Sequence, residues 1–141
     1  MSNLQQRIRI SAAYTRSINL SRDRENSEFV RAYVLTSRAR QALTQIAAGL
    51  GKADLPRALA LIGPYGSGKS AFGLFLSALL AADSPAHPIA MATLQAADPE
   101  LTERFRRPLA RGRRGFLRVP INGLPDSLTR QLLLGLALAA E

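Results

Sequence analysis

Apolar and polar positions follow a helical period in the first third of the chain. Apolar residues recur at spacings of four, three and four, at Ala39, Leu43, Ile46 and Leu50. This spacing places them on one face of a helix. Thr36 or Ser37 supplies a side-chain oxygen suited to a helix N-cap, and Gly51 is one of two glycines that offer a stop. The pattern therefore predicts a helix over about 37–49.

Short apolar runs between polar segments predict strands. Residues 58–62 (ALALI) end at a glycine, and their length suits a buried parallel strand. Residues 115–121 (GFLRVPI) predict a second strand, in which Pro120 favours an early end or an edge position. Residues 15–20 alternate weakly and predict a short edge strand.

Three further segments predict helices. Residues 69–82 are apolar almost all round, as in a helix that is buried against a sheet. Residues 98–100 combine an acidic cap, a proline and a second acid, which is a helix start, and Pro108 is expected to stop that helix. Residues 125–127 begin a last helix over about 127–140.

The predicted order is helix, strand, helix, short helix, strand, helix. Strands that alternate with helices indicate an α/β fold with a parallel sheet and right-handed crossovers, built in three layers. We expect residues 1–28 to form a flexible or extended arm and 29–141 to form one domain, because 141 residues suffice for one hydrophobic core.

Composition narrows the class of protein. Apolar residues make up 47% and charged residues 21%, which is typical of a globular chain. The absence of cysteine excludes a disulfide framework and a thiolate metal site, and His87 is the only histidine, so no zinc site is expected. No segment resembles a signal peptide or reaches the ~20 apolar residues of a membrane span, so we expect a cytoplasmic protein.

The net charge of +9 is unevenly distributed. The segment Arg104–Arg118 holds seven arginines and no acid. Such a cluster could contact nucleic-acid phosphates, or reach the nucleotide of a neighbouring subunit, or form a solvated basic loop. Of its two aromatic residues, Phe105 shares a face of the predicted helix with Leu101 and Phe116 lies near the end of the segment, so base stacking is not supported.

The sequence GPYGSGKS, residues 63–70, fits the phosphate-binding pattern GxxxxGK(S/T). A predicted strand precedes it and a predicted helix follows it, as this motif requires. The predicted nucleotide-binding residues of the loop are Gly63, Pro64, Tyr65, Gly66, Ser67, Gly68, Lys69, Ser70 and Ala71.

Each position of the loop has a physical reason. The glycines permit the unusual φ and ψ angles with which backbone N–H groups wrap a polyphosphate, and the following helix directs its N-terminus at the anion. Lys69, the predicted catalytic residue, reaches the β- and γ-phosphates as a compact point charge, where the wider fork of arginine does not fit. The Ser70 hydroxyl is a predicted Mg²⁺ ligand. The alternative is a glycine-rich turn beside a surface lysine.

These residues resemble the P-loop NTPases. With 33–36 ahead of the first helix, the chain resembles the N-terminal part of AAA+-type, origin-recognition-like or STAND-type bacterial ATPases over roughly 29–140. The resemblance implies ATP and Mg²⁺ as ligands, an oligomeric ATPase and a role in DNA metabolism or phage defence. It also implies an adenine pocket lined by Tyr33, Val34 and Leu35, and the alternative for Tyr33 is an ordinary, partly buried aromatic.

Hydrolysis in that family needs a second strand that ends in an acid, which holds the Mg²⁺ water shell. Asp98 and Asp126 both precede predicted helices as caps, and Glu141 ends one, so none fits. We therefore expect the N-terminal portion of a longer ATPase, truncated before the acidic strand. A nucleotide-gated switch or scaffold without hydrolysis and a small-molecule P-loop kinase are the alternatives.

Overall fold

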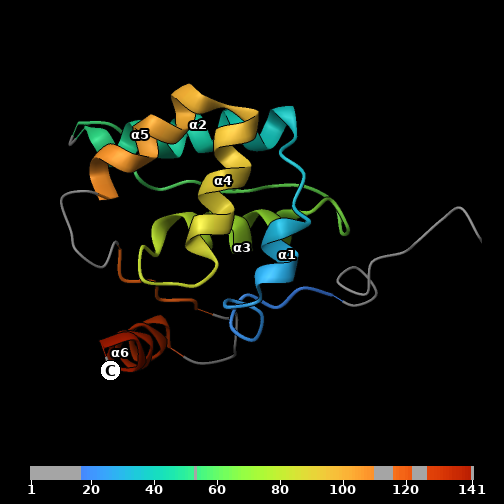
Figure 1. Cartoon of the computed structure of the whole chain (residues 1–141). Helices are drawn as coiled ribbons and strands as arrows, with labels where there is room; N and C mark the ends of the chain where they lie inside the picture. The colour runs from blue at the N-terminus through green and yellow to red at the C-terminus, as the bar shows by residue number, and fades with distance from the viewer. Residues whose placement is uncertain (1–16, 53, 110–115, 122–126, 141) are drawn as a thin grey trace, which may run out of the picture.

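A computed structural model describes residues 17–52, 54–109, 116–121 and 127–140. The described residues form six helices: α1 (Ser27–Arg31), α2 (Ser37–Gly51), α3 (Lys69–Leu80), α4 (His87–Ala97), α5 (Pro99–Leu109) and α6 (Leu128–Ala140). In Figure 1, α2 and α5 lie side by side at one end, α4 crosses from them towards α3 and α1, and α6 lies apart.

The hydrophobic core lies where α2, α3, α4 and α5 meet. Its fully buried side chains come from all four helices and include Leu43, Phe75, Leu79, Leu94 and Phe105. The ring of Tyr33, just before α2, stacks on Phe75 with 4.4 Å between the ring centroids. Helix faces therefore supply the buried apolar surface on which the stability of the chain depends.

The predicted helices are confirmed, with small shifts at their ends. α2 begins after Thr36, whose hydroxyl accepts a hydrogen bond from the N–H of Ala39 at 3.2 Å. α5 begins after Asp98, whose carboxylate accepts from the N–H of Leu101 at 2.9 Å. Pro108 lies inside the last turn of α5 and does not stop the helix before it.

Two helices are not predicted by the sequence, α1 and α4. α4 is held by a stripe of small and apolar residues, because Ala90 and Leu94 are fully buried in the core. Pro88 lies in its first turn, where a missing N–H costs no hydrogen bond. An alanine-rich stripe between prolines is a weak periodic signal, and the segment 83–97 therefore resembles a loop in sequence.

The predicted α/β fold is wrong: the described residues contain no strand and no sheet. A strand exists only by pairing with another strand, and residues 58–62 run extended without such a partner within the described part of the chain. Their side chains are not buried, and Ile62 is 95% exposed. The short apolar run satisfied the local pattern of a buried strand while lacking the neighbour that would bury it.

The second predicted strand also stays unpaired in the described residues. Gly115 lies outside the described residues, and 116–121 passes along α3, where the N–H of Phe116 donates to the carbonyl of Leu80 at 3.0 Å. Segment 54–64 instead follows α2, and a Cβ on Gly49 would lie 2.6 Å from the carbonyl oxygen of Pro56. The two extended segments thus pack against different helices.

The predicted edge strand at 15–20 is not a strand where it is described: residues 17–19 have no regular structure, and a turn begins at Leu20. The buried carboxylate of Asp23 organises this turn by accepting from the N–H of Asn19 at 2.9 Å and from the guanidinium of Arg22. The hydrogen bond to Asp23 raises the pKa of Arg22 above its ordinary value. The predicted arm over 1–28 lies outside the described residues up to 16, and from Ser27 it is helical.

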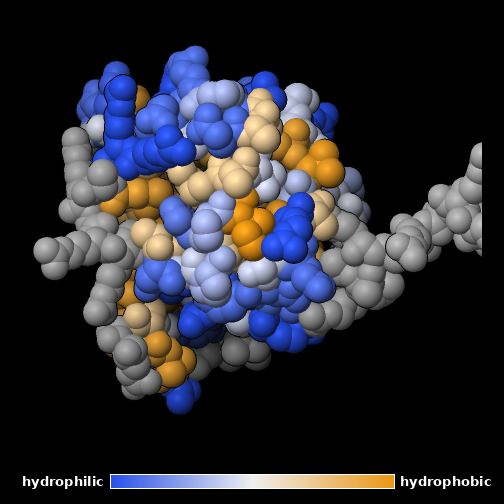
Figure 2. Space-filling model, viewed as in Figure 1, coloured by the Kyte–Doolittle hydropathy of each residue, from blue (hydrophilic) through white to orange (hydrophobic). Residues whose placement is uncertain are grey.

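Apolar side chains remain exposed where α6 lies. Figure 2 shows them gathered at the lower left of the molecule. None of the described helices is both long enough and apolar enough to span a membrane.

Candidate functional site

The phosphate-loop sequence forms a tight turn between the extended segment 54–64 and α3. Gly66 and Gly68 have φ angles of +79° and +84°, and they are the only described residues with positive φ. A Cβ at either position would meet no atom within 4 Å. Backbone conformation, not lack of space, is therefore what requires glycine at these two positions.

Gly68 is also the N-cap of α3 and supplies no side chain to the helix end. The first N–H groups of a helix lack partners within the helix, and they carry the positive end of its dipole. The N-terminus of α3 thus meets the turn without a side-chain cap. This is the local arrangement that binds anions in proteins.

The Lys69 side chain folds back across the turn. Its Nζ donates to the carbonyl oxygens of Gly63 at 2.9 Å and Pro64 at 2.7 Å, and it lies 3.4 Å from the hydroxyl of Ser67. A Cβ on Gly63 would lie 2.9 Å from that same hydroxyl, so a larger residue there would displace Ser67. The Lys69 ammonium therefore links the start of the loop, at Gly63 and Pro64, to the start of α3.

A cavity of about 340 Å³ lies between the loop, the start of α2 and α3. Its lining residues are Tyr33, Val34, Thr36, Arg38, Ala39, Ala42, Leu61, Ile62, Gly63, Pro64, Ser67, Gly68, Lys69, Ala71 and Phe72. Its volume falls in the ~300–1,000 Å³ range of small-ligand sites. The cavity thus joins the loop to the segment that the resemblance assigns to adenine.

Two of the three predicted adenine contacts line the cavity, and they differ in exposure. Val34 is 74% exposed on the cavity wall, whereas Tyr33 is half-buried and stacked on Phe75. Leu35, the third candidate, does not line the cavity and packs against the hydrophobic core. Tyr33 is therefore a packed aromatic residue that also borders the cavity.

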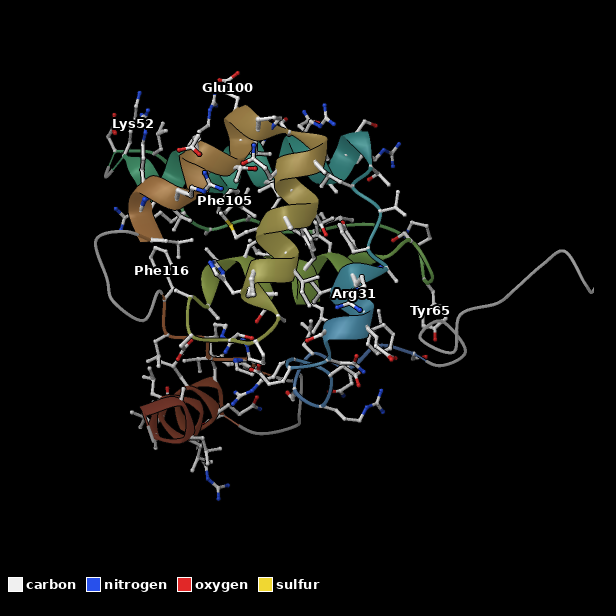
Figure 3. The ribbon with its side chains drawn as sticks, in the orientation of Figure 1. Arg31, Lys52, Tyr65, Glu100, Phe105 and Phe116 are labelled. Carbon is white, nitrogen blue, oxygen red and sulfur yellow. The ribbon has the colours of Figure 1, made fainter. Side chains whose placement is uncertain are left out.

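Three predicted loop residues do not line the cavity. Tyr65 projects from the tip of the loop, is 94% exposed, and places its hydroxyl 3.2 Å from that of Ser17 (Figure 3). Gly66 contributes its backbone turn. Ser70, the predicted Mg²⁺ ligand, is exposed in the first turn of α3.

Arg38 is a residue of the cavity that sequence analysis missed. It lies in the first turn of α2 and brings a second cation to the wall that carries Tyr33 and Val34. The sequence places Arg38 in the first turn of the helix that begins after the cap at Thr36, one residue before Ala39. This position does not by itself predict a contact with the loop. Only the packing of α2 beside the loop shows that this arginine and Lys69 share one cavity.

The lining residues of this cavity, as described, include no aspartate or glutamate. Asp98 is engaged elsewhere, because it caps α5 and lies 3.6 Å from the guanidinium of Arg40. Asp126 and Glu141 lie outside the described residues. In the part of the chain that the structure describes, no group of three or more potential ligands could hold a metal ion.

The Arg104–Arg118 segment is partly neutralised by acids from outside it. Arg104 pairs with Glu100 and Arg106 pairs with Glu103, both on the exposed surface of α5. Arg118 pairs with Glu25 at 3.2 Å. The remaining arginines of the segment except Arg107 lie outside the described residues. Arg104 and Arg106 are thus solvent-exposed, whereas the side chain of Arg118 is only 19% exposed and also reaches the hydroxyl of Ser77.

Comparison of the chain with protein-family models, with curated proteins and with solved structures finds no match.

Proposed function

We propose that this chain binds the phosphates of Mg-ATP at the loop 63–70. The observation that carries the proposal is the conformation of the loop: two glycines with positive φ lead directly into the N-terminus of α3, with Lys69 folded over them. Backbone N–H groups at a helix start and a lysine ammonium together form a phosphate-binding arrangement.

Lys69 is the residue whose hydrogen bonds we expect to change most on binding. Its ammonium donates to two neutral carbonyl oxygens, of Gly63 and Pro64. Hydrogen bonds from an ammonium to charged phosphate oxygens are stronger than those to neutral acceptors. We expect a triphosphate to draw Nζ away from at least one carbonyl. Mg²⁺ would take the Ser70 hydroxyl as an oxygen ligand.

The apolar side of the cavity suits the base. Val34, Ala42 and Phe72 offer carbon surface next to the cationic end of the site. Ligand sites typically combine such apolar walls with a few polar groups that fix orientation. ATP as the nucleotide rests on the resemblance to AAA+-type and STAND-type ATPases, which also suggests a cytoplasmic role in DNA metabolism or phage defence.

We propose binding, and not hydrolysis, as the activity of these residues. Activation of the attacking water in ATPases needs an acid near the Mg²⁺ and the γ-phosphate. The described lining of the cavity contains no acid. A nucleotide-gated switch therefore fits these residues better than a complete ATPase or a kinase.

The test is isothermal titration calorimetry of the 141-residue chain with Mg-ATP, using the two lysines of the sequence as a matched pair. Lys69→Ala should abolish measurable binding, because it removes the cation of the loop. Lys52→Ala is the control, since Lys52 follows the far end of α2, away from the loop (Figure 3). Absence of heat with the wild-type chain, or equal affinity in both variants, would contradict the proposal.

A further inference from the structure

The positive charge of the chain is not neutralised evenly over the described residues. The chain carries a net charge of +9. Ion pairs with acids engage Arg22, Arg24, Arg40, Arg104, Arg106 and Arg118. Lys52, Arg57 and Arg107 are exposed, and within the described part of the chain their side chains make no ion pair and no hydrogen bond. These three cations are therefore available to a partner.

Lys52 and Arg57 both lie at the C-terminal end of α2. Lys52 is the C-cap of this helix, and its N–H donates to the carbonyl of Ala48 at 3.1 Å. Segment 54–64 turns back over the last turns of α2, where a Cβ on Gly49 would lie 3.8 Å from Cα of Arg57. Packing of this segment on α2 thus brings the two cations to one place.

α5 brings Arg107 to the same end of the molecule, because it runs beside α2 in the same direction. The guanidinium of Arg40 donates to the carbonyl of Ala97 at 3.1 Å and lies 3.6 Å from the carboxylate of Asp98, so the starts of the two helices are adjacent. Figure 1 shows the helices side by side along their length. Arg107 lies in the last turn of α5, as Lys52 follows the last turn of α2.

The basic end, which we define as Lys52, Arg57 and Arg107, has little acid to balance it. Asp54 is exposed and lies two residues after Lys52, whereas Glu103 of α5 is already paired with Arg106. Figure 2 shows mostly hydrophilic residues over this end. Three further arginines follow α5 in the sequence; they lie outside the described residues, and the basic end does not include them: Arg111, Arg113 and Arg114.

We propose that the basic end binds the sugar-phosphate backbone of a nucleic acid without reading its sequence. Cations from three separate segments suit a ligand whose negative charges repeat along its length, and a phosphodiester backbone has this property. Phe105, the aromatic residue of α5, is fully buried and offers no surface on which a base could stack. Phosphate contacts alone fix position and supply affinity, but they carry no sequence information.

Binding through so few contacts should be weak and strongly dependent on salt. Each phosphate that a lysine or arginine neutralises releases counterions, so three contacts predict a slope of about −3 for log K against log salt concentration. Fluorescence anisotropy of a short labelled DNA duplex, measured in a series of NaCl concentrations and without nucleotide, gives this slope. Two duplexes of unrelated sequence should bind with equal affinity.

The variant test removes the three cations one at a time. Lys52→Ala, Arg57→Ala and Arg107→Ala should each reduce the slope by about 1, and each should weaken binding about five- to tenfold at about 0.1 M salt. Arg31→Ala is the matched control, because Arg31 is an exposed arginine of α1 that lies far from Lys52 (Figure 3). Its slope should equal that of the wild type. Circular dichroism checks that every variant keeps its helix content.

The same phosphate chemistry occurs in DNA and in RNA, so the titration is repeated with an RNA duplex of the same sequence. Binding of either duplex with the expected variant effects supports the proposal, and the tighter of the two identifies the source of the phosphates. Absence of binding to both duplexes overturns it. So does binding that the three variants leave unchanged, or that Arg31→Ala weakens as much as they do, because the basic end would then not be the surface that binds.

Discussion

Gly68 shows how a single residue can set the conformation of the site. Its φ of +84° lies in the left-handed region, where a side chain is strained, although a Cβ would meet no neighbour. We expect Gly68→Ala to cost about 1–2 kcal/mol of unfolding free energy. Urea denaturation followed by circular dichroism measures this cost. Because the loop would relax away from its phosphate-binding shape, affinity for Mg-ATP should also fall.

One outcome for Gly68→Ala would contradict this expectation. If Gly68→Ala keeps both the stability and the nucleotide affinity of the wild-type chain, the left-handed turn is not needed for either. The proposed role of the loop conformation would then be wrong, whatever the fate of Lys69.

Arg38 is the second residue whose replacement tests the proposed nucleotide site. It lines the cavity from the side of Tyr33 and Val34. We expect Arg38→Ala to weaken Mg-ATP binding by about two- to thirtyfold, since one cation–anion or cation–π contact is worth about 0.5–2 kcal/mol. Calorimetry measures the change. Arg107→Ala, an exposed arginine of α5 that does not border this cavity, is the charge-matched control and should bind as the wild type does.

At the scale of elements, two glycines of α2 offer a matched pair. Gly49 is buried, and a Cβ there would lie 2.6 Å from the backbone oxygen of Pro56, so Gly49→Ala must push segment 54–64 away from α2. We expect a loss of about 1–3 kcal/mol. Gly51 has nothing within 4 Å, and Gly51→Ala should stabilise the helix by about 0.5 kcal/mol. Thermal unfolding of both variants tests the contact, and equal shifts would show that segment 54–64 does not pack there.

The elements also show which parts of the fold a sequence can predict. α2 and α5 were predictable because caps at Thr36 and Asp98 and a periodic apolar face are local signals. α4 was missed because only Ala90 and Leu94 of its residues are buried, and an alanine carries little hydrophobic signal. The strands at 58–62 and 115–121 were wrongly predicted because a strand depends on a distant partner. No local pattern shows whether that partner is present.

At the scale of the whole molecule, one part of the candidate site follows from local sequence and the other part depends on packing. The turn of the phosphate loop follows from its own glycines, and the structure shows it with positive φ at Gly66 and Gly68. The meeting of the loop with Val34 and Arg38 depends on how α2 packs beside α3, which no short stretch of sequence specifies. A wrong prediction of the sheet therefore leaves the loop conformation intact while changing which residues surround it.

If the chain binds Mg-ATP as proposed, that arrangement links the stability of the whole chain to the ligand. The cavity is bordered by α2, α3 and the extended segment between them, so a bound nucleotide contacts elements that separate on unfolding. A ligand that binds only the folded state adds about 2.7 kcal/mol at a hundredfold excess over its dissociation constant. We expect Mg-ATP to raise the melting temperature of the wild-type chain and of Lys52→Ala, but not of Lys69→Ala. An equal rise in Lys69→Ala would place the nucleotide elsewhere on the molecule, since the loop would have lost its cation. A rise that inorganic triphosphate reproduces in full would show that the phosphates alone hold the elements together, and that the apolar wall at Val34 adds nothing to binding.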